Sequence, residues 1–520
     1  MKTTSIPTTC DYAIIGAGAA GSVVANRLSA NPDVQVVVLE AGDWDWEPDV
    51  TNPGGFVELW GSRVDWALPT TPQAGLGGRE ITINQGKVVG GSTCINAMMY
   101  VRGNPANFDQ WQALGATGWS YADVLPYFKK IEHYEGGASA YHGDQGEIWV
   151  RDCPDEVMRA DEFLQGAVEL GYDGPRWDYN GERQENGAGF LQFHITPGNE
   201  RDTSALSFLQ PVQQRPNLTL ITQAQVTRIV VEHGRAVGVE YLRDGELRRL
   251  NVSREVVLSA GALQSPKLLL LSGIGPAAHL QELGIAVQAD LPGVGQNLQD
   301  HVQLPVIFRS LGTRPMTTLL TGNVLFVKTN PDAPAPDLQL NFTPSIPAPL
   351  APHLPDFGGP VCIFLPILVQ PKSVGEVKLA SADPLDKPLV NPNYLSDPAD
   401  LEVFHKALEL IRNLAGTAAF APLNGGELAP GPGDPDGFIR SQGSTLWHPA
   451  GTCRMGQDAH AVVDPELRVR GIEGLRVADA SVMPTVTSGN TVAACFMIGE
   501  RAAEMLLRPQ PAARPRAAMA

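Results

Sequence analysis

The chain has 520 residues, of which 43% are hydrophobic and 18% are charged. This composition is typical of a globular protein, and the length predicts two or more lobes instead of one core. The formal net charge of −18 and the pI near 5.0 argue against nucleic acid or an anionic membrane as a partner.

The first ten residues contain no apolar segment of the signal-peptide type, and the longest apolar run, 361–369, is interrupted by Pro366. A membrane-spanning helix needs ~20 apolar residues, so we expect no membrane span. The six cysteines form no Cys-x-x-Cys pair and no Cys/His cluster with metal-ligand spacing. We therefore expect free thiols, a cytoplasmic protein and no bound metal.

The first predicted unit, about 11–40, is an apolar strand, a Gly-x-Gly-x-x-Gly turn, a helix and a second apolar strand. Gly16 allows the tight turn, Gly18 lets the backbone approach a pyrophosphate, and Gly21 lets the helix pack on the strand. The helix N-terminus offers free N–H groups to the phosphates. Glu40 is placed to accept hydrogen bonds from ribose hydroxyls. The unit predicts a dinucleotide site without distinguishing FAD from NAD.

A loop-rich segment, about 43–80, comes next and leads to a second Gly-rich element, 86–93. Strand-like alternation returns at 218–222, 226–231 and 237–241. His233-Gly234 lies between the last two of these segments and predicts a hairpin turn.

Residues 255–271 predict a strand, a Gly turn and a helix with Pro266 in its first turn. The composition shifts from about 313 to 370, with prolines crowded at 331–360, which predicts a second lobe that is mostly β with long loops. The last third ends in a predicted helix, 493–507. The tail that follows is rich in Pro, Ala and Arg, and we expect it to be disordered.

Four segments are longer than a generic dinucleotide-binding pattern requires: 86–96, 261–275, 291–301 and 479–491. The first two resemble the two signatures of the glucose-methanol-choline (GMC) oxidoreductases, Gly-Lys-Val-Val-Gly-Gly-Ser-Thr-Cys-Ile-Asn and Gly-Ala-Leu-Gln-Ser-Pro-Lys-Leu-Leu-Leu-Leu-Ser-Gly-Ile-Gly. The other two are also similar to motifs of that family. The resemblance extends over about residues 11–507.

This resemblance implies an α/β fold with a Rossmann-like FAD-binding domain and a discontinuous substrate-binding domain built on a mostly antiparallel sheet. The expected boundaries are 1–305, mainly the FAD domain with insertions at about 43–80 and 151–200; 306–440, mainly the substrate domain; 441–507, a return to the FAD domain with the catalytic residues; and 508–520, the tail.

The resemblance also implies FAD instead of NAD. The positions expected along FAD are Gly16, Gly18, Ala19, Ala20, Gly21, Glu40, Trp66, Val88, Asn96, Ala97, Met98, Met99, Val226, Asp479, Ala480, Asn490 and Thr491. Ala19 and Ala20 would meet the pyrophosphate, and Val226 would contact the adenine through its backbone. Some relatives bond the flavin covalently to a His in the second Gly-rich loop. That position is Ile95 here, which predicts noncovalent FAD.

Oxidation of an alcohol needs a base that removes the hydroxyl proton as a hydride leaves the same carbon. The segment 445–454, Thr-Leu-Trp-His-Pro-Ala-Gly-Thr-Cys-Arg, resembles the family's catalytic-His segment. The resemblance makes His448 the general base and Asn490 the group that hydrogen-bonds the substrate oxygen. Trp447 is expected either in the pocket wall or in the core. His301 is expected to have a structural role, tying a loop to the FAD lobe.

The implied function is FAD-dependent oxidation of a primary alcohol, of the aromatic, furanic or aliphatic class, to the aldehyde. The electron acceptor would be oxygen, a quinone or a dye, because an oxidase and a dehydrogenase share these motifs. Two alternatives remain open: a choline-type dehydrogenase with a quinone acceptor, and a hydroxynitrile lyase that keeps FAD only as structure. The Trp-His-Pro segment disfavours a photodecarboxylase, and the two signatures disfavour an NAD dehydrogenase.

Overall fold

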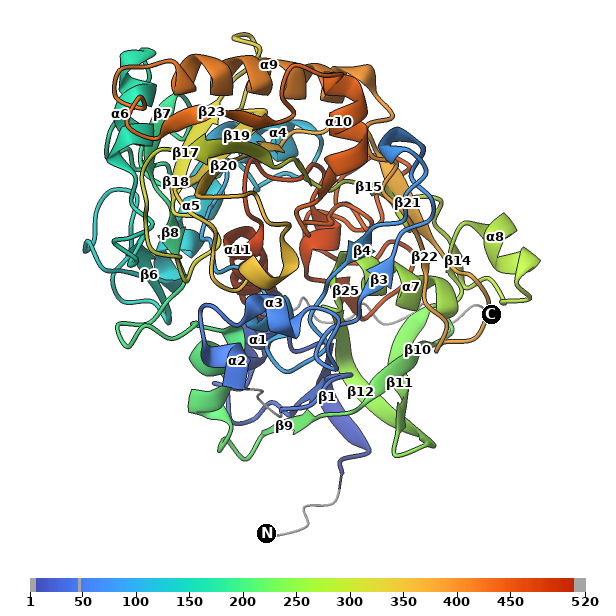
Figure 1. The fold of residues 1–520 in the computed structure, drawn as a ribbon. Coiled ribbons are helices and arrows are strands. Elements are labelled where there is room, and N and C mark those ends of the chain that lie inside the picture. The colour runs from blue at the N-terminus through green and yellow to red at the C-terminus, as the bar shows by residue number, and fades with distance from the viewer. Residues whose placement is uncertain (1–5, 45–47, 509–520) are drawn as a thin grey trace, which may run out of the picture.

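A computed structural model of the chain describes residues 6–44 and 48–508 (Figure 1). Within these ranges two large sheets carry the fold, one of seven strands and one of eight. The predicted α/β class with a second, mostly antiparallel lobe is confirmed. Residues 509–520 of the predicted tail lie outside the described residues.

The first sheet has a parallel centre and an antiparallel edge. Its strands are β1 (Thr9–Ile15), β2 (Val36–Leu39), β9 (Leu218–Ile221), β10 (Gln225–Glu232), β11 (Arg235–Arg243), β12 (Glu246–Leu258) and β25 (Leu475–Val477). The central strands are apolar and buried on both faces, as a parallel sheet covered by helices requires. The predicted hairpin is confirmed, because Glu232 pairs with Arg235 across a turn in which His233 and Gly234 have φ of 51° and 76°.

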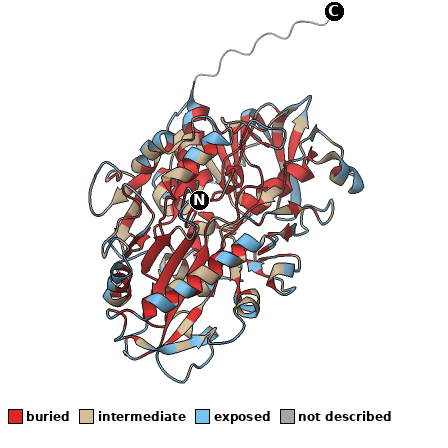
Figure 2. Cartoon of the chain, turned by 90° about the horizontal axis from the view of Figure 1, so that it is seen from above, coloured by how far each residue is buried: buried red, intermediate tan, exposed pale blue. Residues whose placement is uncertain are grey.

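Two helices, α1 (Ala19–Leu28) and α11 (Val492–Leu507), pack against each other beside the first sheet. The second confirms the predicted terminal helix. The glycines Gly21 and Gly499 make the packing possible. A Cβ at Gly21 would lie 2.1 Å from the Gly16 carbonyl oxygen, and one at Gly499 would lie 2.7 Å from the Ala20 carbonyl oxygen. Figure 2 shows the interior of the molecule as largely buried residues.

Helix α7 (Gly261–Leu271) begins four residues earlier than its sequence suggests. Pro266 therefore lies in the interior of the helix and not in its first turn, so that prediction is wrong. Proline has no N–H to donate to the carbonyl of residue 262. The Thr452 hydroxyl donates to the Ala262 oxygen instead, at 2.6 Å, so the carbonyl that Pro266 leaves free is satisfied.

The second sheet is antiparallel throughout. Its strands are β7 (Gly187–Phe190), β16 (Val302–Gln303), β17 (Val306–Ser310), β18 (Asn323–Val327), β19 (Leu338–Thr343), β20 (Val361–Leu368), β23 (Asn424–Ala429) and β24 (Ser444–Thr445). Helices α6 (Asp161–Glu169), α9 (Pro398–Ala415) and α10 (Pro435–Gln442) lie near it, with α9 along the top of Figure 1. The 151–200 segment, which we expected as an insertion of the first domain, supplies α6 and β7 to this lobe.

The chain passes between the two lobes at β16 and again just after β24. These two short strands pair with each other in antiparallel register, Val302 with Thr445 and Gln303 with Ser444. The pairing continues toward the first lobe through the isolated bridge between Gln299 and Ala450. Residues 299–303 and 444–450 therefore run side by side although they are far apart in the sequence.

The remaining elements are short helices and small sheets. They are α2 (Pro48–Thr51), α3 (Phe56–Leu59), α4 (Pro105–Ala113), α5 (Tyr121–Ile131), α8 (Ala277–Glu282), β3 (Leu68–Pro69), β4 (Thr82–Ile83), β5 (Glu132–Tyr134), β6 (Ile148–Asp152), β8 (Gln192–Phe193), β13 (Ile274–Gly275), β14 (Ala289–Asp290), β15 (Gln296–Leu298), β21 (Gly375–Lys378) and β22 (Leu389–Asn391). Over residues 6–44 and 48–508 we find no helix that combines the length and apolarity needed to cross a membrane.

Candidate active site

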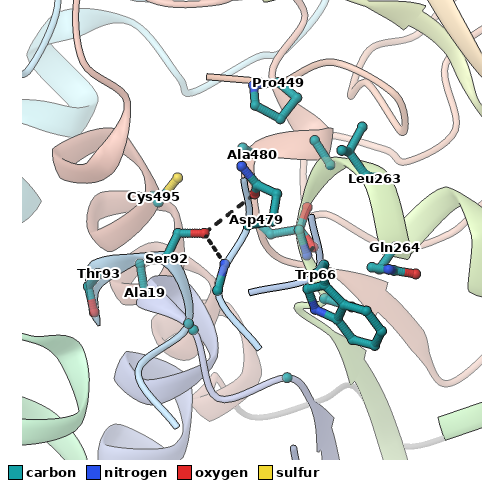
Figure 3. Close-up of a pocket in the computed structure, with 18 of the residues that line it drawn as sticks. Ala19, Trp66, Ser92, Thr93, Leu263, Gln264, Pro449, Asp479, Ala480 and Cys495 are labelled. Atoms are coloured by element: carbon teal, nitrogen blue, oxygen red, sulfur yellow. Dashed lines mark hydrogen bonds between the residues drawn. The ribbon is translucent and has the colours of Figure 1, made fainter. Parts of the chain in front are cut away.

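One long pocket connects the first Gly-rich turn with the crossing between the lobes. Residues from many separate elements line it, as Figure 3 shows, with Ala19, Ser92 and Cys495 on one side and Trp66, Leu263 and Gln264 on the other. The expected cofactor positions that line this pocket are Gly16, Gly18, Ala19, Ala20, Glu40, Trp66, Asn96, Ala97, Met98, Met99, Val226, Asp479, Ala480, Asn490 and Thr491.

At one end of the pocket the two Gly-rich segments approach each other without side chains between them. A Cβ at Gly91 would lie 2.7 Å from the Cα of Gly18, and one at Gly16 would lie 2.5 Å from the Ser259 carbonyl oxygen. Helix α1 begins here with no capping side chain and no acidic residue in its first turn. Its free N–H groups and dipole suit a pyrophosphate.

Glu40 lies at the same end and is almost fully buried. One carboxylate oxygen accepts from the Ala17 N–H at 2.9 Å, and the other accepts from the Gly42 N–H at 2.8 Å. Burial raises the pKa of Glu40, and these backbone N–H groups and nearby Lys87 oppose the shift. Each oxygen keeps a second lone pair, so the carboxylate can hold the Gly-rich turn and still accept from a ribose hydroxyl.

Two expected positions do not line the pocket. Val88 is fully buried in a small apolar cluster with Val50, Leu59 and Cys94 and does not line this pocket, so its assignment to the cofactor stays a prediction. Its neighbours Gly86 and Gly91 line the pocket instead. Gly21 faces Gly16, which fits the helix-packing role that the turn motif predicts for it.

The segment 96–99 forms part of the pocket wall and is held from behind. The Asn96 side-chain oxygen accepts from the Met98 N–H at 3.0 Å and from the buried Arg201 guanidinium at 2.9 Å. Met98 has φ of 60°, a backbone conformation that residues other than glycine rarely adopt, so the backbone of this wall has an unusual shape. On another wall, Asp479 accepts from the Gly261 N–H at 2.9 Å and from the Ser265 hydroxyl at 2.6 Å.

These features fit FAD. The glycine approach leaves room for a pyrophosphate, the uncapped helix supplies donors, and Glu40 supplies a ribose acceptor. The pocket continues from that end to polar side chains that can perform chemistry, as a dinucleotide with a distant reactive ring requires.

At the other end of the pocket lie His448 and Asn490. The Nε2 atom of His448 is 3.3 Å from the side-chain Nδ2 atom of Asn490. His448 follows β24, and Asn490 precedes α11. Both residues line the pocket, so a substrate oxygen there can meet an imidazole and an amide together.

His301 completes this arrangement. Its Nδ1 atom lies 2.9 Å from the Nδ1 atom of His448, and the two rings meet edge to face. We expected His301 only to tie a loop, a role that Asn297 takes by donating to the Gly451 and Pro484 carbonyl oxygens. The sequence would predict a role for His301 beside His448 only if residues 301 and 448 were already known to lie on paired segments.

Burial favours the neutral form of both imidazoles. Burial lowers the pKa of His448 well below its ordinary value, and neighbouring His301 lowers it further. Burial also lowers the pKa of His301 to about 3, against the opposing effect of the Thr487 and Val369 backbone carbonyls. A neutral imidazole has one N–H and one lone pair, so His448 can accept a proton.

Asp300 anchors the segment that carries His448. One carboxylate oxygen accepts from the His448 backbone N–H at 2.7 Å, and the other accepts from the hydroxyls of Thr445 and Tyr394. Burial raises the pKa of Asp300 to about 6, and these donors oppose the shift. Trp447, between Thr445 and His448, is held at φ of 61°, which is costly for an aromatic residue and typical of functional sites.

Apolar and aromatic side chains surround this end of the pocket. The Trp447 ring lies 4.5 Å from that of Trp60, centroid to centroid, so Trp447 is in the pocket wall. Sequence reasoning missed Trp60 and Leu320, because each belongs to a segment without a motif. It also missed Leu446, which lies in the catalytic-His segment but has no chemistry of its own to mark it. The carboxylates among the described lining residues are Glu40 and Asp479, and backbone donors hold both.

A model of the GMC oxidoreductases matches residues 10–303 with its N-terminal part and residues 371–499 with its C-terminal part. The chain belongs to the GMC oxidoreductase family. It is 40% identical to an oxygen-dependent choline dehydrogenase of Sinorhizobium medicae (strain WSM419), over 97% of this chain and 96% of the relative. It is 39% identical to an alcohol dehydrogenase [acceptor] of Pseudomonas putida, over 96% of each chain.

Among solved structures, pyridoxine 4-oxidase from Mesorbium loti superposes with a TM-score of 0.88 at 32% identity, over 95% of this chain and 98% of that chain. The likeness thus extends over both lobes of this GMC oxidoreductase. The protein is an FAD-dependent alcohol oxidoreductase, an enzyme acting on CH–OH donors.

Proposed function

We propose that this GMC oxidoreductase oxidises an uncharged primary alcohol to the aldehyde, with His448 as general base and Asn490 as the partner of the substrate oxygen. The observation that carries the proposal is the 3.3 Å approach of His448 Nε2 and Asn490 Nδ2 at the apolar end of the FAD pocket. A base and a donor that meet at one point are what alcohol oxidation requires.

The roles follow from the atoms that face the pocket. The lone pair on His448 Nε2 takes the hydroxyl proton, and the Asn490 amide donates to the oxygen as negative charge develops on it. When bound, FAD supplies the acceptor for the hydride that leaves the alcohol carbon. Trp60, Trp447 and Leu446 exclude water from this end, which strengthens both hydrogen bonds.

A choline-type activity is the second candidate, supported by the identity to choline dehydrogenases and by the tryptophan faces of Trp60 and Trp447. Such faces can attract a quaternary ammonium group. Against it, the lining carboxylates Glu40 and Asp479 are already held by backbone N–H groups. A cationic substrate would enter this end without a paired negative charge, which is costly.

An anaerobic panel on the purified protein tests the proposal. Benzylic, furanic and aliphatic alcohols and choline are added at equal concentration while the visible flavin absorbance is followed. We expect a neutral alcohol to bleach the flavin faster than choline does. Faster bleaching by choline would favour the second candidate. A flavin that stays oxidised with every alcohol would refute the proposal in favour of lyase chemistry. Admitting air afterwards separates oxygen from a quinone or dye as the acceptor.

We also propose that the FAD is bound without a covalent link. Ile95 lines the pocket with an aliphatic side chain that has no nucleophilic atom. Acid precipitation of the holoenzyme should therefore release all of the flavin into the supernatant, and flavin retained in the protein pellet would contradict this. The cytoplasmic location stays a prediction, supported by six cysteines that are all free thiols.

A further inference from the structure

Strand β19 carries polar residues that are buried without being part of any sequence motif. Leu338, Leu340 and Phe342 face the core beneath the helices of the second lobe. Gln339 and Asn341, on the opposite face, have exposed fractions of only 0% and 1%. An alternating strand normally turns its polar face to solvent. Here the polar face is covered, and Gln339 on it contacts Asn490, which lines the catalytic pocket.

Gln339 reaches the catalytic amide from this strand. Its Nε2 atom donates to the Asn341 side-chain oxygen at 3.0 Å and makes a longer contact, 3.5 Å, to the Asn490 side-chain oxygen. Its own oxygen is buried without a hydrogen-bond partner. The side chain therefore acts on Asn490 only as a donor.

We propose that Gln339 is a positioning residue that fixes the orientation of the Asn490 amide and, through it, the tautomer of His448. This inference rests on the proposed function. If the Asn490 oxygen faces Gln339, its NH₂ group must face His448, so Nε2 of His448 must accept. The proton of His448 then sits on Nδ1, which leaves the lone pair at Nε2, the atom toward Asn490 and the pocket.

The His301 end of this series of hydrogen bonds accommodates the same arrangement. With its proton on Nδ1, His448 donates to His301 Nδ1 across 2.9 Å, which places the His301 proton on Nε2. The His301 Nε2 atom is buried without a hydrogen-bond partner, so it sets no direction of its own. The selection of one proton arrangement therefore comes from Gln339 through the Asn490 amide.

The variants Gln339→Glu and Gln339→Met distinguish the direction of the hydrogen bond to Asn490 from the packing of the side chain at 339. A carboxylate at 339 can only accept, so it turns the Asn490 amide and presents its oxygen to His448 Nε2. That favours a proton on Nε2, and the pH profile of flavin reduction should move to higher pH. At neutral pH we expect the rate constant for flavin reduction to fall by ~10²-fold, which is a typical contribution of a general base. Gln339→Met, which leaves the amide free to turn, should give a smaller loss.

Asn341→Asp is the matched control, because it adds the same charge to the same face of β19 and keeps the acceptor for Gln339. Its alkaline shift should be much smaller than that of Gln339→Glu. Each variant is first checked for wild-type flavin content and melting temperature. If Gln339→Glu does not fold, a wild-type rate and pH profile in Gln339→Met would overturn the inference. It is also overturned if Glu and Met at 339 cause equal losses without a pH shift. A wild-type flavin that no alcohol reduces would refute the proposed function, a separate result.

Discussion

At the scale of single residues, the site depends on a neutral histidine with a defined lone pair. His448→Ala should keep FAD bound, because His448 lies at the far end of the pocket from the Gly-rich turn. Flavin reduction by the best alcohol should fall by ~10²–10⁴-fold. Stopped-flow absorbance measures this. His353→Ala, a change at an exposed histidine, is the control and should reduce at the wild-type rate. Wild-type reduction in His448→Ala would remove His448 from the mechanism.

Glu40 is the second decisive residue, because one carboxylate holds two backbone N–H groups of the nucleotide end. Glu40→Gln places an NH₂ group against one of these donors. A buried donor left unpaired costs about 1–3 kcal/mol. We expect lower FAD content after dialysis and a lower free energy of unfolding in urea. Glu58→Gln, an exposed site in α3, should change neither quantity. Full FAD retention in Glu40→Gln would show that the carboxylate does not hold the nucleotide.

At the scale of elements, cofactor binding depends on how closely α11 approaches the start of α1. Gly499→Ala would place a Cβ 2.7 Å from the Ala20 oxygen and 2.8 Å from the Ala20 Cα, both backbone atoms that cannot turn aside. The helices must separate, which costs about 1–3 kcal/mol and shifts the N–H groups that face the pocket. Thermal melting and FAD content should both fall.

Gly416→Ala is the control for that change. Gly416 has φ of −82°, and a Cβ there would meet nothing nearer than 3.4 Å. We expect a wild-type melting temperature. If Gly499→Ala melts and retains FAD like the control, the contact of α1 with α11 is not a constraint on the site.

The elements also show where sequence reasoning succeeds and where it stops. The first Gly-rich turn and Glu40 lie within one short unit, so local pattern alone predicted their site. His301 and His448 are 147 residues apart, and only the register of β16 with β24 brings them together. No local signal encodes that register. Gln339 was missed for the same reason, because its strand looks like an ordinary half-exposed one. The predicted place of Pro266 in the first turn of α7 was wrong because the hydroxyl of Thr452, which is distant in the sequence, replaces the N–H donor that proline lacks.

At the scale of the whole molecule, a buried charge cluster makes stability depend on pH. His142 lies 3.0 Å from a Glu132 oxygen and 2.9 Å from an Asp178 oxygen, and Arg102 also pairs with Glu132. Burial lowers the pKa of His142, but the bonds to Asp178 and Glu132 outweigh it and raise the pKa above 6.5. Burial raises the pKa values of Glu132 and Asp178, yet Arg102 and His142 bring both below their ordinary values.

The directions of these pKa shifts determine the pH range over which stability changes. The His142 contribution is complete below its unfolded pKa of 6.5 and is lost as the pH rises through the higher folded value. The two carboxylates contribute above their unfolded values of 4.5 and 3.8 and lose this as the pH falls. We expect the free energy of unfolding in urea to decrease as the pH rises above 6.5 and through the raised folded pKa of His142. His142→Gln should reduce that decrease, whereas His353→Gln should leave it intact. An equal decrease in all three proteins would exclude the cluster as its source.

The pairing of β16 with β24 has a mechanical consequence. His301 and His448 lie beside this ladder, and the Leu446 N–H donates to the His301 carbonyl oxygen at 2.9 Å. A displacement of either segment must therefore carry the other with it. The two imidazoles can keep their spacing while side chains elsewhere in the pocket adjust to a substrate.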